Sequence, residues 1–352
     1  MSHGSLSILA GADALAELRS SGLRPERIRN FVGASGGPKW LVLHGIDRVL
    51  FPWLVEHTQA PLHVVGSSIG SWRAAALATR EPLRALDELC NEYIEQHYSK
   101  RPSPREISAG GEKILSAALG KDGVAPLVDH PLFRLHIVTA RMRHIGAREG
   151  VLQQFGLGAA ILFNAIDRRA LGLSLERVVF DAGGDPGPFA PWQALPTTHV
   201  PLTAHNALAA LHASAAIPAV MDGVRDPHGA PAGTYRDGGV ADYHFGREID
   251  ATDGLTLYPH FYPHLVPGWF DKMLPWRRTT GLKRTIVIAP SREHVVSLPG
   301  GKIPDRDDFV KMNDRDRIAA WRTVIKLGET MGEELHALLE SGRIGAVARL
   351  LE

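Results

Sequence analysis

The first eighty residues alternate between short apolar runs and longer segments in which apolar residues recur every three or four positions. Residues 28–32 and 62–65 are β-prone runs, and a glycine follows each of them closely. Helical spacing then covers residues 40–56 and 69–79, the second of which is rich in alanine. This rhythm of strand, tight loop and helix predicts parallel strands with helices packed on the sheet.

The rest of the chain is predicted to extend the same sheet and its helical layers. Further strands are expected at 135–140 and 285–289. A Gly- and Pro-rich stretch is predicted to be an irregular loop, residues 181–201. Helices are expected at 13–20, with Asp13 as its N-cap, at 112–119, at 205–214 and at 315–341.

The organisation predicted from these elements is one domain over residues 1–352, because no linker separates two independent cores. Two segments interrupt the pattern and are interpreted as insertions, at about 99–130 and 258–280. The predicted fold class is α/β, with three α/β/α layers and a mainly parallel central sheet.

Composition narrows the possible partners and locations. Lys plus Arg number 39 and Asp plus Glu number 38, so the net charge of +1 creates no overall field that attracts nucleic acid. A single cysteine, Cys90, excludes an internal disulfide and fits a helical core position. The N-terminus lacks a signal peptide pattern and no run reaches the length of a membrane span, so a cytoplasmic protein is expected, with peripheral membrane contact left open. We expect no metal and no cofactor, because no cluster of ligand residues stands at metal-binding spacing.

The sharpest motif follows the second predicted strand. Residues 66–70 read Gly-Ser-Ser-Ile-Gly and fit G-x-S-x-G, with Gly66 and Gly70 flanking Ser68. A strand before and a helix after this motif are what a nucleophile elbow requires. Ser68 is therefore the predicted nucleophile, while the alternative is a serine-rich cap of an ordinary helix.

Two further segments could complete a site for acyl transfer. The glycine run ending in Gly36, Gly37, Pro38 and Lys39 opens the first long helix. Its backbone N–H groups could hold an oxyanion, with donors expected from Gly36 and Gly37 and a contribution from the Lys39 amide. A tight turn without a ligand is the alternative.

The second segment, Thr234-Tyr-Arg-Asp237-Gly-Gly, places a carboxylate before two glycines. A serine nucleophile needs a neighbouring base, and Asp237 is a candidate, although Asp-Gly is also a common surface turn.

The order of these blocks resembles patatin-like phospholipases: a glycine loop, G-x-S-x-G, an A-S-x-A-x-P segment at 213–218, and Asp-Gly-Gly at 237–239. The resemblance spans residues 33–240 and implies a Ser68–Asp237 dyad without a histidine. It also implies a lipid or fatty acyl ester as substrate. Family loops usually read G-G-G-x-[RK]-G, whereas this chain has Ser35 and Trp40 at the first and last glycine positions.

Two other interpretations remain open from the sequence alone. The first is an α/β-hydrolase with a Ser-His-Asp triad, for which His260, His264 and His294 lie late enough in the chain. Against it, only one strand is predicted before residue 62. The second is a non-catalytic lipid- or acyl-binding protein on the same scaffold.

An aromatic and basic segment covers residues 258–278 and includes Trp269 and Phe270. Trp and Tyr favour membrane interfaces, and Lys and Arg meet anionic head groups there. The segment is thus a candidate interfacial flap, with packing in the core or in a dimer as the alternative. The sequence indicates neither the oligomeric state nor the length of the acyl group.

Overall fold

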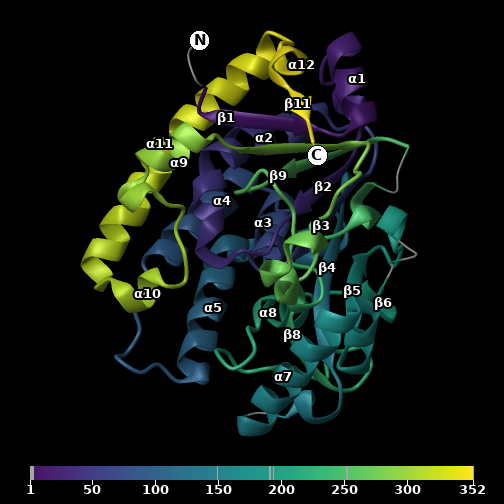
Figure 1. Cartoon of the computed structure of the whole chain (residues 1–352), viewed down its shortest axis with the longest axis vertical. Helices are drawn as coiled ribbons and strands as arrows, with labels where there is room; N and C mark the ends of the chain where they lie inside the picture. The colour runs from purple at the N-terminus through teal and green to yellow at the C-terminus, as the bar shows by residue number, and fades with distance from the viewer. Residues whose placement is uncertain (1–3, 149, 190–191, 193, 251–252, 352) are drawn as a thin grey trace.

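One mixed β-sheet organises the part of the chain that the computed structural model describes, residues 4–148, 150–189, 192, 194–250 and 253–351 (Figure 1). Its main path follows the order β11-β1-β10-β9-β2-β3-β4-β5-β6, and β8 pairs with both β4 and β7. The strands are β1 Leu6–Ala10, β2 Ile28–Gly33, β3 Leu62–Ser67, β4 Phe133–Met142, β5 Leu175–Ala182, β6 Thr197–Leu202, β7 Val224–Arg225, β8 Thr234–Asp237, β9 Leu255–Pro259, β10 Thr285–Pro290 and β11 Arg349–Leu350.

The centre of the sheet is parallel and its flanks are mixed. Strands β10, β9, β2, β3 and β4 run parallel to one another, whereas β1 is antiparallel to β10, and both β5 and β8 are antiparallel to β4. Apolar residues fill both faces of the central strands, as expected for a sheet covered by helices. The predicted α/β class with a mainly parallel sheet is confirmed.

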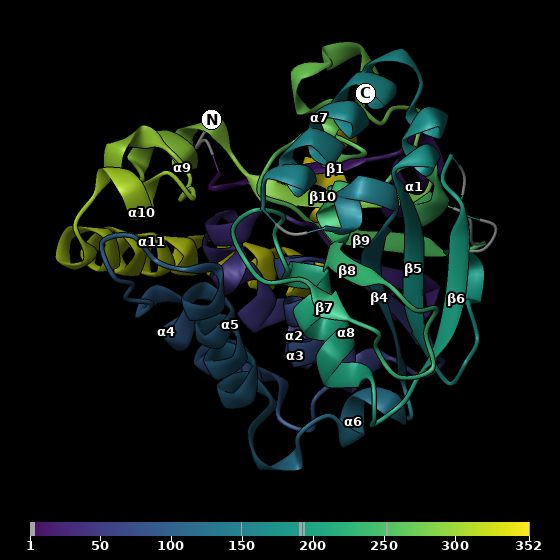
Figure 2. The same ribbon diagram turned by 90° about the horizontal axis from the view of Figure 1, so that it is seen from below.

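The helices pack in groups around the sheet (Figures 1 and 2). Helix α3 contacts β2, β3 and β4, while α2 packs against α4 and α11, and α5 packs against α4. In both views α4, α5, α9, α10 and α11 gather on the left and β5 and β6 lie on the right. The helices are α1 Ala12–Ser21, α2 His44–His57, α3 Ile69–Leu77, α4 Pro82–Ile94, α5 Pro104–Leu119, α6 Ala125–Val128, α7 Val151–Ile166, α8 Ala207–Ala215, α9 Arg292–Ser297, α10 Asp308–Lys311, α11 Asp314–Glu340 and α12 Ile344–Val347.

Several sequence predictions need correction at the helix starts. Asp13 does not cap α1: the N-cap is Gly11, without a side-chain hydrogen bond, and Asp13 lies in the first turn. The helix predicted from residue 40 begins as a 3-10 segment, η2 Gly37–Leu43, and becomes α-helical at His44. The short helix predicted at 112–119 is the end of α5, which begins at Pro104 after the Ser103 cap accepts a hydrogen bond from the Glu106 amide.

The strand predictions were also incomplete. A second strand, β1, precedes residue 62 and was missed in the sequence prediction. Part of the loop predicted at 181–201 is strand: β5 extends to Ala182 and β6 begins at Thr197, while 190, 191 and 193 lie outside the described residues. In the described residues, no helix combines the length and apolarity needed to cross a membrane.

Candidate active site

Ser68 stands at a sharp turn between β3 and α3. Its φ of 54° and ψ of −134° are unusual for a residue with a side chain, and such strain persists only where packing enforces it. The enforcing contacts come from glycines: a Cβ on Gly70 would lie 2.0 Å from the Gly33 carbonyl oxygen, and one on Gly66 would lie 2.5 Å from the Gly70 oxygen. The sequence G-x-S-x-G thus allows strand and helix to approach closely while the serine occupies the turn.

Helix α8 holds this turn against the sheet through Ser214. The Ser68 amide donates a hydrogen bond to Ser214 Oγ (3.0 Å), and the Ser214 hydroxyl donates to the Val138 carbonyl on β4 (2.7 Å). Ser214 belongs to the A-S-x-A-x-P block, but the sequence gave no indication of its contacts, because its partners lie far away along the chain.

Asp237 ends β8 and faces Ser68. Its amide donates to the Ala216 carbonyl (2.9 Å), so the same block positions both residues. Asp237 Oδ2 accepts a hydrogen bond from Ser68 Oγ at 2.7 Å, and Oδ1 accepts one from the Gly239 amide at 2.7 Å. Ser68 and Asp237 are only 4% and 5% exposed.

Burial and charge act in opposite directions on the Asp237 carboxyl. Burial raises the pKa of Asp237 above the usual value of 3.8, because the charged form loses its hydration. The Arg306 guanidinium, 4.0 Å from Oδ2, opposes this rise, as do the hydrogen bonds from Ser68 and Gly239. The net direction is upward, which makes the group a stronger base than an exposed aspartate.

The glycine loop lies beside this pair. Gly37 adopts a φ of +55°, and a Cβ there would lie 3.0 Å from Arg306 Nε. In the described part of the chain, the amides of Gly36 and Gly37 have no hydrogen-bond acceptor. The Lys39 amide instead donates a hydrogen bond to the Gly36 carbonyl (3.4 Å). The Lys39 ammonium forms an ion pair with Asp305, and burial lowers the pKa of Lys39 to about 8.

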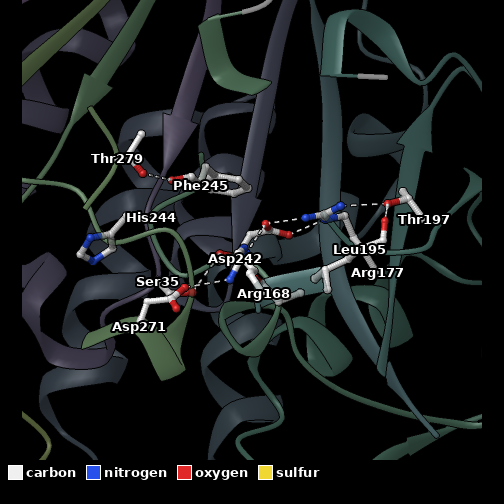
Figure 3. A network of polar contacts seen from close by, with 12 residues as sticks. Ser35, Arg168, Arg177, Leu195, Thr197, Asp242, His244, Phe245, Asp271 and Thr279 are labelled. Carbon is white, nitrogen blue, oxygen red and sulfur yellow. Dashed lines mark hydrogen bonds and ion pairs between the residues drawn. The ribbon is translucent and has the colours of Figure 1, made fainter. Parts of the chain in front are cut away.

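A buried polar network ties the loop and the elbow to the rest of the sheet (Figure 3). Ser67 Oγ donates to the Asp242 carbonyl (2.6 Å) and lies 2.9 Å from Ser35 Oγ. The Asp242 carboxylate binds the Arg177 guanidinium through two contacts of 2.5 and 2.7 Å, with Arg168 at 3.3 Å. These contacts fix the chain that follows Asp237. None of these roles was visible in the sequence.

A cavity of about 1060 Å³ opens beside Ser68. Its volume lies at the upper end of the roughly 300–1,000 Å³ typical of ligand pockets. Its lining is mostly apolar and comes from α3, α4, α5, α8 and the segment around α10, and includes Gly37, Ser68, Trp72, Ile107, Ile114 and Phe309. The segment interpreted as an insertion, 99–130, therefore supplies one wall of this cavity through α5.

Comparison with known proteins now decides the family. A model of the family described as patatin-like phospholipase matches residues 39–244, a range that contains Ser68 and Asp237 and begins after Gly36 and Gly37. The chain belongs to the patatin-like phospholipase family. Among solved structures it is similar to VipD from Legionella pneumophila, at 12% identity and a TM-score of 0.36, over 97% of this chain and 71% of that chain. No curated protein matches the chain.

The histidines in the described part of this patatin-like chain make their contacts away from the Ser68–Asp237 pair. Among the described residues, no histidine forms a hydrogen bond with either side chain. His260 is fully buried, and its Nδ1 contacts the backbone of Tyr262, while burial lowers its pKa to about 3. His294 lies on α9. His264 stacks on the Tyr262 ring, so each of the three histidines considered for a triad has other contacts.

The aromatic segment, residues 258–278, lies partly in the core and partly at the surface. Trp269 and Phe270, in η9 Trp269–Met273, are half-buried against a small apolar cluster that includes Val240, and Trp269 lines a depression beside Asp237. The large apolar side chains of this segment that are exposed are instead Met273 and Trp276.

Proposed function

We propose that this chain hydrolyses fatty acyl esters of lipids, with Ser68 as nucleophile and Asp237 as its base. The observation that carries the proposal is the 2.7 Å hydrogen bond from Ser68 Oγ to Asp237 Oδ2 at the head of an apolar cavity. Membership of the patatin-like phospholipase family implies a lipid acyl hydrolase and agrees with this assignment.

Acylation begins when Ser68 Oγ attacks the ester carbonyl carbon. Its proton passes to Asp237 Oδ2, the atom that already accepts the serine hydrogen bond. The carbonyl oxygen becomes an oxyanion, which the amides of Gly36 and Gly37 stabilise, since no protein acceptor in the described residues occupies them. The protonated Asp237 then gives its proton to the departing alcohol, leaving an acyl ester on Ser68.

Deacylation reverses these roles with water in place of the alcohol. Asp237 removes a proton from the attacking water and returns it to Ser68 Oγ as the Ser68–acyl bond breaks, which releases the free acid and restores the starting dyad. The raised pKa of Asp237 suits both acylation and deacylation, because a stronger base takes the proton of serine or water more readily. The fixed Gly239 amide keeps the carboxylate oriented throughout.

The acyl chain is assigned to the large cavity beside Ser68. Burying methylene groups against its apolar walls contributes about 0.8 kcal/mol per CH₂. Longer acyl groups should therefore bind more tightly until the cavity is full. Gly37 and Arg306 line this cavity on the side of the glycine loop, where the polar part of the substrate would sit.

A chain-length series of p-nitrophenyl esters tests this proposal. We expect kcat/KM to rise from short to long acyl groups and Ser68→Ala to reduce turnover to the background rate. The matched control is Ser67→Ala, which removes the neighbouring hydroxyl. It should lose about 1 kcal/mol of stability and retain most activity, because among the described residues the Ser67 hydroxyl bonds only to Asp242 and Ser35. Equal inactivity of the two folded variants would refute Ser68 as the nucleophile.

A further inference from the structure

Helix α7 turns several large apolar side chains toward solvent. Its 16 residues, VLQQFGLGAAILFNAI, contain no Asp, Glu, Lys or Arg. One helical face is exposed, and we call it the α7 face: Leu152, Phe155, Leu162 and Ile166. The exposed fractions of the last three are 67%, 68% and 81%. A helix on a protein surface normally points such a stripe into the core.

The opposite side of α7 is small or polar and is held by specific contacts. Gln153 Oε1 accepts a hydrogen bond from the Ala219 amide (2.8 Å), and Asn164 Nδ2 donates to Asp271 Oδ1 (2.7 Å). Four buried positions spaced at three or four residues form this side: Gln153, Gly156, Ala160 and Asn164. These contacts fix the rotation of the helix about its axis, so the apolar stripe is held facing solvent.

Neighbouring segments extend the exposed apolar area. Exposed large apolar side chains are normal when they are scattered singly, but a contiguous group usually marks an interaction site. Turns η4 His144–Ala147, η5 Arg168–Leu173, η9 and η10 Pro275–Arg277 adjoin α7 or one another and carry further exposed residues. These are Ile145, Leu173, Met273 and Trp276, the last 74% exposed.

Most charges around this surface are basic, although exposed Asp167 directly follows Ile166. Arg148 precedes α7 and Arg169 follows it, and both are exposed. Arg277 Nη2 donates to the Ala165 carbonyl near the end of the helix (3.4 Å), with exposed Arg278 beside it. Within the described part of the chain, no carboxylate forms an ion pair with Arg148, Arg169 or Arg278. Apolar side chains with arginines at their border match a lipid surface with anionic head groups.

The helix that carries this face adjoins the candidate active site through its buried side. Turn η9, which packs against α7, carries Trp269, and Trp269 lines the depression beside Asp237. The Gln153 contact holds Ala219, which directly follows Pro218, another residue of that depression. A lipid surface bound at α7 would therefore lie next to the site that acts on its lipids.

The geometry points to the α7 face and the adjoining turns η9 and η10 as the surface that docks this protein on an anionic lipid bilayer. The helix lies in the interface, since no described helix can cross a membrane. This inference rests on the proposed function, because a lipid bilayer is the occupant that supplies acyl esters to Ser68. It replaces Trp269 and Phe270, which are half-buried, as the principal membrane contacts.

Vesicle binding by the full chain tests the inference. Phe155→Gln, Leu162→Gln and Ile166→Gln would be combined in the Ser68→Ala background, so that the vesicles stay intact. The control combines Val55→Gln, Val296→Gln and Val347→Gln, exposed apolar residues on α2, α9 and α12, at the far end of the molecule from α7 in Figure 1. Flotation would use phosphatidylcholine vesicles with and without phosphatidylglycerol. The triple α7 variant should bind at least about tenfold more weakly, and the control should bind like the parent.

The same substitutions with Ser68 intact should leave hydrolysis of short soluble esters unchanged. Parent-like vesicle binding by the triple α7 variant would overturn the inference, and so would a parent that binds neither vesicle. A parent that is dimeric in light scattering, with a monomeric α7 variant, would make the face a contact between copies instead. If the protein binds vesicles through α7 but hydrolyses no ester, the proposed function fails and the docking surface stands.

Discussion

Replacing Asp237 with asparagine should lower kcat/KM for a short soluble ester by about 10²–10⁴-fold in a folded protein. The amide can still accept the Ser68 hydrogen bond but cannot take its proton. Alanine substitutions at His260, His264 and His294 should each leave substantial turnover, because none of these histidines bonds to Ser68 or Asp237 among the described residues. A folded histidine variant as inactive as Asp237→Asn would restore a triad.

The pH profile gives this prediction a second readout. Activity needs ionised Asp237, so the acidic limb of kcat/KM should lie above the usual aspartate pKa of 3.8, since burial raises the pKa. The Arg306 guanidinium lies 4.0 Å from Asp237 Oδ2 and stabilises its charged form. Arg306→Gln should therefore raise the pKa of Asp237 further and move the acidic limb of kcat/KM to higher pH. A limb that stays in place or moves to lower pH would show that Asp237 is not the titrating base.

Asp242→Ala should lower the free energy of unfolding by about 3–5 kcal/mol, the typical result of removing one partner of a buried ion pair. Asp242 is fully buried and Arg177 is 1% exposed, so the substitution leaves a guanidinium without its counter-charge in the core. Arg168 also loses one of its two carboxylate partners. Urea denaturation followed by circular dichroism measures the change.

The control for this prediction is Asp307→Ala, which breaks an exposed pair with Lys311. Solvent screens such pairs, so the denaturation midpoint should stay within error of the parent. If Asp242→Ala were as harmless as Asp307→Ala, the network of Figure 3 would not hold the segment after Asp237.

Local sequence carried enough information for the fold class and for the parts of the candidate site that depend on one short segment. Gly66 and Gly70 mark a strand-to-helix crossing, because only glycine permits the close backbone approach found there. The strands around residues 28–33 and 62–67 follow from short β-prone runs, each ending in a glycine or just after one. The family assignment made from the order of the motifs is confirmed by the match over residues 39–244.

Features that depend on distant partners could not be predicted in the same way. Ser214 and Arg306 come next to the Ser68–Asp237 pair only through folding. Ser214 belongs to a recognisable block, but the block does not indicate its partners, and Arg306 lies in a segment without a distinctive pattern. The apolar content of residues 151–166 is visible in the sequence, but its outward direction is set by Gln153 and Asn164. Asp13 failed as a cap because Gly11 occupies that position.

Reaction with a fluorophosphonate, followed by peptide mass mapping, tests the central claim most directly. The reagent phosphonylates an activated serine, and the dyad predicts one adduct on the peptide that contains Ser68. Labelling should be abolished in Ser68→Ala, slowed in Asp237→Asn and retained in Ser67→Ala. No adduct on the folded parent, or an adduct on a different residue, would contradict Ser68 as a nucleophile activated by Asp237.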